Sequence, residues 1–431
     1  MNSDLLSKAK KRASDLIPSG AHTYSRASDQ FPLNAPDFIL RSEGCKAYAS
    51  DGKSYLDYGM GLFSVSLGHA YLPVISAISS NLSIGNSFSK PSLLEGELAE
   101  RLHHAIPSAE MVKFAKNGSD ANSAAVRLAR YYTQRDLVVR CKGQPFLSFD
   151  DWFIGSTSRP GGVPKCERSL ILQMEYNNVK SLEALFHEFP KQIACVIIEP
   201  VTFYEPENGF LQLVKSLCEK EGALLIFDEV ITGFRWHIGG AQTYFGVTPH
   251  LSTFGKGMAN GFALSAVVGK REVMDAGRRN GPVFLLSCTY GGEIVGLSAG
   301  IKTFDVFNNE PVIQHYWNYG RKLKGIISEL IERYNLDSFI SVIGMDCRPE
   351  IDFHGGGHFD RWELKTLFLQ EMINMGVFME RICISYSHSE TDLEWTKTAL
   401  AKALNQVSIA VQAGNISQFY DGEAIKPVFT Y

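Results

Sequence analysis

The middle of the chain alternates between short apolar runs and segments with helical spacing. Two of these runs, ACVIIEPV (194–201) and ALLIFDEV (223–230), have the length of buried strands and end at carboxylates. The segment between them ends at Gly222, a residue typical of helix ends, and carries apolar residues at helical spacing: Phe210, Leu213, Val214, Leu217 and Cys218. A strand, a helix and a strand within about 30 residues predict a right-handed βαβ unit and hence a parallel sheet.

The N-terminal and C-terminal parts of the chain have different hydrophobic patterns from the middle. Near the N-terminus, KAYASDGKSYLDY predicts a hairpin that turns at Asp51-Gly52. From about residue 310 onward, helical patterns such as ELKTLFLQEMINMG alternate with short strands. We therefore predict an α/β protein with one large domain, residues 61–309, and a smaller α+β domain, to which residues 1–60 and 310–431 contribute.

Composition narrows the classes of ligand. Of the 431 residues, 45% are apolar, which is enough for a large core, and the net charge of −4 leaves no polybasic surface. Nucleic acid and membranes are therefore poor candidates, and a small molecule is the expected ligand. The eight cysteines form no Cys-x-x-Cys pair, and no stretch resembles a signal peptide or a membrane span. We expect a soluble cytoplasmic protein with reduced thiols.

Three chemically active side chains follow successive apolar runs. Glu199 and Asp228 end the two runs above, and Lys256 follows a third, LSTFG; the spacings of 29 and 28 residues each fit one crossover. The carboxyl ends of parallel strands share one edge of a sheet, so these residues are expected to converge. Buried carboxylates need compensation, which a cationic heteroaromatic cofactor held by the lysine would supply.

Two further segments fit such a cofactor. In KNGSDANSAAVRLARYY, Asn117, Gly118 and Ser119 precede an alanine-rich helical run, and a helix start of this kind can bind a phosphate monoester. An ordinary helix cap is the alternative interpretation. In FDDWFIGST, Trp152 or Phe153 could stack on a flat ring, although packing in the core is the more common role of such residues.

These motifs together resemble the class III aminotransferases, which are fold-type-I enzymes dependent on pyridoxal 5′-phosphate, and most closely their glutamate-1-semialdehyde 2,1-aminomutase branch. The resemblance covers nearly the whole chain and rests on IPSGAHTYSRA, NGSDANSAAVRLAR, VIIEPV, DEVITGFR with FGK, and SYSHSETDL. It implies a large domain with a mainly parallel seven-stranded sheet flanked by helices, and a small domain built from both termini. The family normally has Glu at Asp120 and Tyr-His-Gly at residues 153–155, where this chain has Phe-Ile-Gly.

The resemblance also implies roles for single residues. Lys256 would form the Schiff base with the cofactor aldehyde and then move the substrate proton, and Asp228 would pair with the pyridine nitrogen. The remaining predicted cofactor contacts are the phosphate ligands Gly118 and Ser119, the ring contacts Phe153 and Val230, the polar residue Glu199, and Thr289, which would reach the phosphate of a neighbouring subunit. The active sites would then be shared within a homodimer.

Substrate contacts are predicted at fewer positions. Arg26 matches the aminomutase arginine that holds a substrate carboxylate, and Trp152 is the second predicted substrate-binding residue. Trp236 and His237 are expected near the active-site entrance, and His388 is expected to be structural. No metal site is predicted, because HGGGH (354–358) has the composition of a surface loop.

Three functions are compatible with these residues. The first is an aminotransferase that moves an amino group from an amino-acid donor to a carbonyl acceptor, with a sugar or polyol as one candidate acceptor. The second is a glutamate-1-semialdehyde-type aminomutase, and the third is a non-catalytic cofactor binder. The aminomutases typically have Ser-Gly-Asn-Pro after the partner threonine, whereas Tyr290-Gly291-Gly292-Glu293 follows Thr289 in this chain, which favours the first function.

Overall fold

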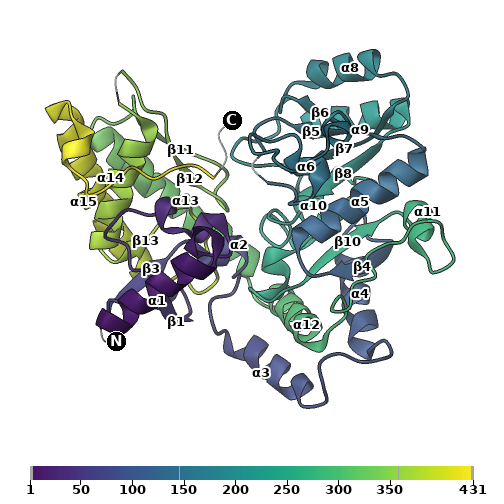
Figure 1. Ribbon diagram of the computed structural model, residues 1–431, viewed down its shortest axis with the longest axis horizontal. Coiled ribbons are helices and arrows are strands. Elements are labelled where there is room, and N and C mark those ends of the chain that lie inside the picture. Colours follow the sequence, from purple (N-terminus) through teal and green to yellow (C-terminus); the bar gives the residue numbers. More distant parts are fainter. Residues whose placement is uncertain (1–2, 145, 358, 429–431) are drawn as a thin grey trace. The chain divides into compact units, whose positions relative to one another are not determined.

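The structure, a computed structural model, describes residues 3–144, 146–357 and 359–428. Within these residues the chain forms two compact units (Figure 1). The central unit consists of residues 63–66 and 72–313. The terminal unit consists of the described residues of 1–62, 67–71 and 314–430, so that both ends of the chain contribute to it.

A mainly parallel sheet forms the middle of the central unit. Its seven strands, among the described residues, lie in the order β4 (Met111–Ala115), β10 (Ser265–Gly269), β9 (Leu251–Phe254), β8 (Leu224–Asp228), β7 (Ile193–Ile198), β5 (Leu137–Cys141) and β6 (Ile171–Met174). Only β10 among them runs antiparallel to its neighbours. The predicted seven-stranded α/β architecture is confirmed.

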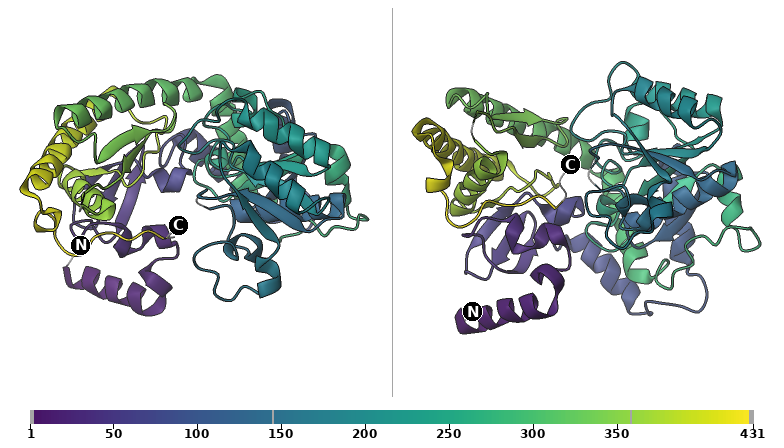
Figure 2. Two further views of the ribbon diagram at one scale, coloured as in Figure 1. Left: turned by 90° about the horizontal axis from the view of Figure 1, so that it is seen from above. Right: turned by 45° about the horizontal axis from the view of Figure 1, so that its top comes forward.

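Helices cover both faces of this sheet (Figure 1 and Figure 2). Alternate residues of β7 separate two apolar cores: Cys195 and Ile197 pack with α5 (Gly118–Thr133), whereas Val196 and Ile198 pack with α8 (Val179–Glu188) and α9 (Phe210–Glu221). The other helices of this unit are α3 (Leu72–Leu82), α4 (Leu93–Ala105), α6 (Asp151–Ile154), α7 (Lys165–Arg168), α10 (Ala241–Tyr244), α11 (Arg271–Met274) and α12 (Ile294–Asn309).

The predicted βαβ unit is present as β7, α9 and β8. The two strands pair in parallel, and Gly222 ends α9 with φ of 68°, the left-handed conformation that glycine adopts without strain. The predicted apolar face of this helix is wrong at one residue, Leu213. Leu213 is 49% exposed, because the buried stripe of α9 is centred on Phe210, Leu211, Val214 and Cys218 and leaves Leu213 beyond its edge.

The terminal unit combines three strands from the N-terminal part of the chain with elements from the C-terminal part. One sheet has the order β1 (Ile39–Glu43), β2 (Lys46–Ala49), β3 (Ser54–Asp57) and β13 (Val377–Phe378), and a second sheet pairs β11 (Ile340–Ile343) with β12 (Glu350–Phe353). Its longer helices are α1 (Ser3–Leu16), α14 (Arg361–Asn374) and α15 (Glu390–Ala413); α2 (Met60–Phe63) and α13 (Val312–Arg333) connect the two units along the chain.

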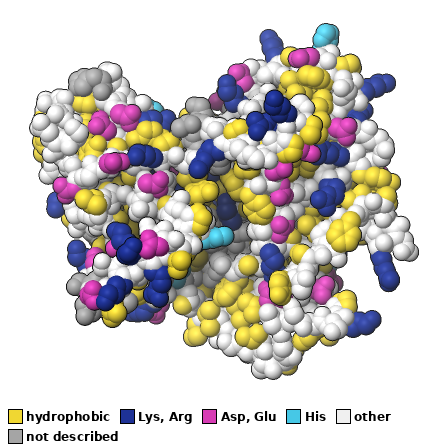
Figure 3. Space-filling model, in the orientation of Figure 1, with side chains coloured by type: hydrophobic (Ala, Val, Ile, Leu, Met, Phe, Trp, Pro, Cys, Tyr) yellow, Lys and Arg dark blue, Asp and Glu magenta, His cyan; other side chains and the backbone are white. Residues whose placement is uncertain are grey.

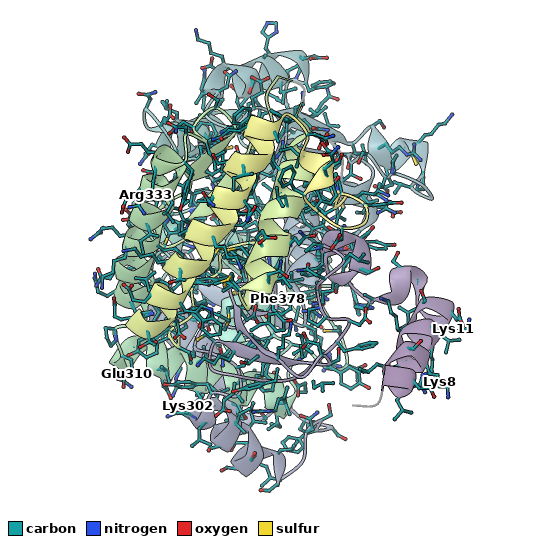
Figure 4. The ribbon with its side chains drawn as sticks, turned by 90° about the vertical axis from the view of Figure 1, so that its left-hand side faces the viewer. Lys8, Lys11, Lys302, Glu310, Arg333 and Phe378 are labelled. Atoms are coloured by element: carbon teal, nitrogen blue, oxygen red, sulfur yellow. The ribbon has the colours of Figure 1, made fainter. Side chains whose placement is uncertain are left out.

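The strand β13 ties the two chain ends together. It pairs in parallel with β3, and the ring of Phe378, labelled in Figure 4, lies 4.6 Å from the ring of Tyr55, measured between centroids. The predicted hairpin is confirmed, because β2 and β3 pair antiparallel around Gly52, which has φ of 84°. A small α+β unit is therefore built from both termini.

Three further predictions concern membrane spans, the HGGGH segment and the cysteines. None of the described helices is long and apolar enough to cross a membrane. In the HGGGH segment, His354 pairs with Asp352 at 3.2 Å, whereas His358 lies outside the described residues. All eight cysteines are free thiols in the structure.

His388 gives the terminal unit an expected pH dependence of stability. Its ring is 1% exposed and stacks on Tyr58, and Nδ1 accepts the N–H of Ser385. Burial lowers the pKa of His388 from 6.5 to about 4, against the opposing charges of Asp392 and Asp57. The unfolded chain therefore binds a proton that the folded chain does not, so stability is complete above about pH 6.5 and falls as the pH drops toward 4.

Because the unfolded chain takes up this proton at His388, we expect the free energy of unfolding to fall by about 2 kcal/mol between about pH 7 and pH 5, as measured by urea denaturation. In His388→Asn, the amide oxygen can still accept the Ser385 N–H but the side chain does not titrate. This component of the pH dependence should therefore disappear. An equal pH dependence in both proteins would show that His388 is not its source.

Candidate active site

The carboxyl ends of β7, β8 and β9 bring three predicted residues to one edge of the central sheet. Glu199 directly follows β7, Asp228 is the last residue of β8, and Lys256 lies two residues beyond β9. The three strands are neighbours and run parallel. The charges of Glu199 and Lys256 both act on the carboxyl of Asp228, so the residues lie within electrostatic reach of one another.

Asp228 is a buried carboxylate that accepts hydrogen bonds from two donors. The N–H of Val230 donates to Oδ1 at 2.9 Å, and the side-chain amide of Asn122 donates to Oδ2 at 2.8 Å. Burial raises the pKa of Asp228, and the charge of Glu199 raises it further, whereas the two donors and Lys256 lower it. A cation placed against this carboxylate would be strongly favoured over water.

Lys256 has an unusual backbone conformation. Its φ is 44°, in the left-handed region that residues other than glycine seldom adopt. It begins a short 3-10 turn, Lys256–Ala259, directly after the strand, and the hydroxyl of Ser66 donates to the carbonyl of Gly257 at 2.9 Å. Such local backbone strain is common at active sites and ligand-binding sites.

The start of α5 forms a narrow cradle beside Val230. A Cβ atom on Gly118 would lie 2.9 Å from both methyl groups of Val230, and one on Gly255 would lie 3.5 Å from the nearer methyl. Asn117 caps the helix, because its side chain accepts the N–H of Asp120 at 3.0 Å. The cap interpretation is therefore correct for Asn117, while Gly118 keeps the space next to Val230 open.

The aromatic pair before Gly155 is buried. Phe153 is fully buried, and the guanidinium of Arg140 lies 5.1 Å from its ring centroid. Trp152 is 6% exposed, and its indole N–H donates to the hydroxyl of Ser123 at 2.8 Å. Both belong to the core beneath α5, and their predicted contacts with ring and substrate stay predictions.

Ser119 and Thr289 have contrasting surroundings. Ser119 is buried, and its hydroxyl accepts the N–H of Phe149 at 3.1 Å. Thr289 is exposed, in the loop before Glu293, which caps α12 and binds Lys116 at 2.6 Å. The phosphate contacts of both residues stay predictions.

Arg26 lines a cavity of about 560 Å³ within the terminal unit. Its guanidinium forms no hydrogen bond or ion pair with the described part of the chain. The same cavity is lined by His69, which binds Asp57 at 3.0 Å, and by Glu380, whose pKa burial raises to about 7. A cation, carboxyl groups and aromatic rings thus surround a space of the size that small molecules occupy.

Trp236 is a core residue. The indole is only 1% exposed and is among the largest fully buried side chains, and its predicted position near the entrance stays a prediction. His237 is exposed, and its Nδ1 accepts the N–H of Gly239 at 3.0 Å.

Sequence reasoning missed two sets of polar residues. Asn122, on α5, donates to Asp228 and accepts the hydroxyl of Thr253, on β9, and an asparagine within an alanine-rich helix gives no signal for this role. Glu229 is buried beside Asp228 and accepts the N–H groups of Ala241 and Gln242 at 2.8 Å each. Glu229 therefore supports the loop after β8. Burial raises the pKa of the Glu229 carboxyl.

The central site fits pyridoxal phosphate on four structural grounds. The buried carboxylate of Asp228 is suited to a protonated pyridine nitrogen, and the cradle between Gly118 and Val230 leaves room that a Cβ atom would fill. The start of α5 offers N–H groups for a phosphate, and Lys256 supplies an amine at the same sheet edge.

The cradle gives a direct test of this fit. In Gly118→Ala the new methyl group would crowd Val230, so we expect the dissociation constant of pyridoxal phosphate to rise about tenfold to a hundredfold. Gly96→Ala, in the exposed part of α4 with no atom within 4 Å of the new Cβ, is the matched control. It should leave the dissociation constant unchanged, as measured by fluorescence titration. Equal affinity in both variants would contradict the cradle.

Comparison with known proteins gives whole-length matches. A family model described as aminotransferase class-III matches residues 24–163 and 159–347. The glutamate-1-semialdehyde 2,1-aminomutase of Alkaliphilus oremlandii is 34% identical over 426 residues, which cover 94% of this chain and 98% of that protein. The enzyme of the same name from Acetivibrio thermocellus is 32% identical, over 91% of this chain and 96% of its own length.

Solved structures share the fold at lower identity. The FumI protein of Sphingopyxis sp. MTA144, solved in its PLP internal aldimine form, has a TM-score of 0.87 at 24% identity, over 95% of this chain and 97% of its own. A glutamate-1-semialdehyde aminomutase from Pseudomonas aeruginosa has a TM-score of 0.81 at 20% identity, over 94% and 95% of the two chains.

Proposed function

Because the chain belongs to the class III aminotransferase family, whose cofactor is pyridoxal phosphate, we propose that it moves an amino group from an amino-acid donor to a carbonyl acceptor in two successive half-reactions. The observation that carries this proposal is the position of Lys256 and Asp228 on neighbouring strand ends. Family membership and this pair together argue against a non-catalytic binder.

The bound cofactor supplies an aldehyde that condenses with amines and a ring that accepts electrons from the substrate carbon. Within this scheme, the start of α5 at Gly118 and Ser119 binds the phosphate, and Asp228 holds a proton at the ring nitrogen. Val230 and Phe153 confine the ring from its faces, and Glu199 offers a polar contact. Lys256 Nζ moves the proton to and from the substrate carbon, as a general acid and base.

The aminomutase reaction is the second candidate, and the names of the similar proteins favour it. Both reactions use Lys256 and Asp228 in the same way, so these residues do not distinguish them. The distinguishing experiment is incubation of the cofactor-loaded protein with glutamate-1-semialdehyde and no amino donor. Rapid formation of 5-aminolevulinate would overturn the aminotransferase proposal, whereas product formation that requires a separate donor supports it.

We assign a sugar-type or other polyol carbonyl as the acceptor class, with Arg26 as the anchor for an acidic group. The cavity around Arg26 offers groups that can bind hydroxyls, because five serines, Ser14, Ser19, Ser25, Ser28 and Ser42, line it together with carboxyl groups. Arg26→Ala should raise the KM of an acidic substrate about tenfold or more with little change in kcat, because uniform binding is lost. An unchanged KM would remove Arg26 from the substrate site.

A homodimer is the proposed assembly. Exposed apolar side chains gather near the loop that carries Thr289: Ile84, Phe88, Leu93 and Tyr290 are 68%, 47%, 87% and 61% exposed. The carbonyl oxygen of Asn86, in the loop between α3 and α4, accepts the N–H of Ile294, the first residue of α12, at 2.9 Å. Figure 3 shows further hydrophobic side chains over the part of this unit where α3 lies in Figure 1. Such a surface is typical of an interface.

Light scattering tests this assembly. We expect the mass of a dimer for the unmodified chain and a shift toward the monomer in Phe88→Asp, because a charge in an apolar interface lacks compensation. Lys220→Ala, an exposed change on α9, is the control and should remain dimeric. A monomer that retains full activity would contradict the shared active site.

A further inference from the structure

Asn122 joins α5 to the carboxylate of Asp228. Its side chain is 1% exposed, and Nδ2 donates both to Asp228 Oδ2 at 2.8 Å and to the carbonyl oxygen of Leu147 at 2.6 Å. Its Oδ1 accepts the hydroxyl of Thr253, on β9, at 2.5 Å. The amide therefore has a hydrogen bond on every side within the core of the central unit.

These partners determine which way the amide points. The carbonyl oxygen of Leu147 can only accept a hydrogen bond, so the nitrogen of Asn122 must face it. The same nitrogen then has its second N–H directed at Asp228, while Thr253 can donate to the oxygen. Asn122 is thus fixed as a donor toward Asp228 and cannot accept a proton from it.

A fixed donor favours the ionised form of Asp228. The N–H of Val230 occupies Oδ1 and the amide of Asn122 occupies Oδ2, so a proton on either oxygen would face an N–H group. These donors act together with Lys256, two residues beyond β9, and they oppose burial and the negative charge of Glu199, which directly follows β7. The hydrogen bonds offset forces that would otherwise neutralise the carboxyl.

The position of Asn122 along α5 adds a geometric role. It lies four residues after Gly118, so it follows the proposed phosphate site by about one helical turn. One rigid helix therefore supports the proposed contacts at both ends of the cofactor, through its N-terminus at the phosphate and through Asn122 and Asp228 at the ring nitrogen.

We propose that Asn122 is a positioning residue that acts through Asp228 to keep the ring nitrogen of the cofactor protonated, and that the carbonyl oxygen of Leu147 fixes its amide in the donating orientation. The inference rests on the proposed pairing of Asp228 with that nitrogen. Neither Asn122 nor Thr253 needs to touch the cofactor or the substrate.

The test uses the purified full chain loaded with pyridoxal phosphate carrying ¹⁵N at the ring nitrogen, observed by NMR as the pH is raised through the neutral range. Asn122→Leu keeps nearly the same volume but has no donor, and Thr253→Val removes one hydrogen bond of the cluster while both donors of Asn122 remain. We expect the ring nitrogen to stay protonated in the unmodified chain and in Thr253→Val. In Asn122→Leu it should lose its proton at lower pH, and the affinity for the cofactor should fall about tenfold to a hundredfold.

Each outcome separates the inference from the function on which it rests. Protonation that is unchanged in Asn122→Leu, or equally disturbed in Thr253→Val, would overturn the role of Asn122. If Asn122→Leu does not fold, Asn122→Ala removes the same donors without adding volume and is judged by the same criterion. An unprotonated ring nitrogen in the unmodified chain would instead contradict the proposed pairing with Asp228.

Discussion

Lys256→Ala is expected to lower kcat by about 10⁴-fold and to remove the visible absorption band of the bound cofactor. A positioned proton-transfer group contributes about 10² to 10⁴-fold, and this amine also forms the covalent bond to the cofactor in the proposed scheme. The variant should remain folded, because removal of the long side chain leaves the end of β9 and its left-handed turn in place. Absorbance spectra and steady-state kinetics on the same samples measure both effects.

The matched control for this variant is Lys220→Ala, which removes an exposed lysine of α9. It should keep the absorption band and the full kcat. A Lys256→Ala protein that kept both would show that another amine binds the cofactor, and the site at the ends of β8 and β9 would then be assigned wrongly.

Asp228→Asn is expected to have the second largest effect, a decrease in kcat of about 10² to 10³-fold. The amide has the same shape but no charge, so it cannot hold a proton at the ring nitrogen while negative charge develops on the ring; lost electrostatic stabilisation of this kind has that magnitude. Affinity for the cofactor should fall in parallel, and titration calorimetry would measure it.

Glu199→Gln provides the comparison, because Glu199 is the other carboxylate at this edge of the sheet. The Glu199→Gln substitution removes a negative charge that raises the pKa of Asp228, so it favours the ionised form of Asp228. We therefore expect kcat to change less than about tenfold. Equal losses in the two variants would mean that the net charge of the site matters and the specific pairing of Asp228 does not.

The sequence predicts the sheet edge well, for a physical reason. Compact apolar runs that end in Glu199 and Asp228 have the length and composition of buried strands, and parallel strands bring their carboxyl ends together. Gly222 and the turn at Gly52 are equally readable, because left-handed backbone leaves a strong signal in composition. These features depend on local sequence and on connection geometry alone.

Contacts between distant segments account for what the sequence does not predict. The approach of Gly118 to Val230, and the bonds from Asn122 to Asp228 and Thr253, join residues more than 100 positions apart. Trp236 shows the same limit in an aromatic residue, because its burial depends on the packing of the whole central unit. Periodicity reports which face of an element is apolar, but it does not report which polar groups meet across two elements.

The central claim is that Lys256 and Asp228 operate a cofactor that carries an amino group between two substrates, and one spectroscopic measurement tests it most directly. The full chain, loaded with pyridoxal phosphate, is mixed first with a panel of amino-acid donors and then, after the donor is removed, with carbonyl acceptors. We predict that the visible band bleaches with a donor and returns with an acceptor, and that Lys256→Ala shows neither change. A band that no donor bleaches, or product formed from a single substrate with no donor at all, would contradict the proposed function.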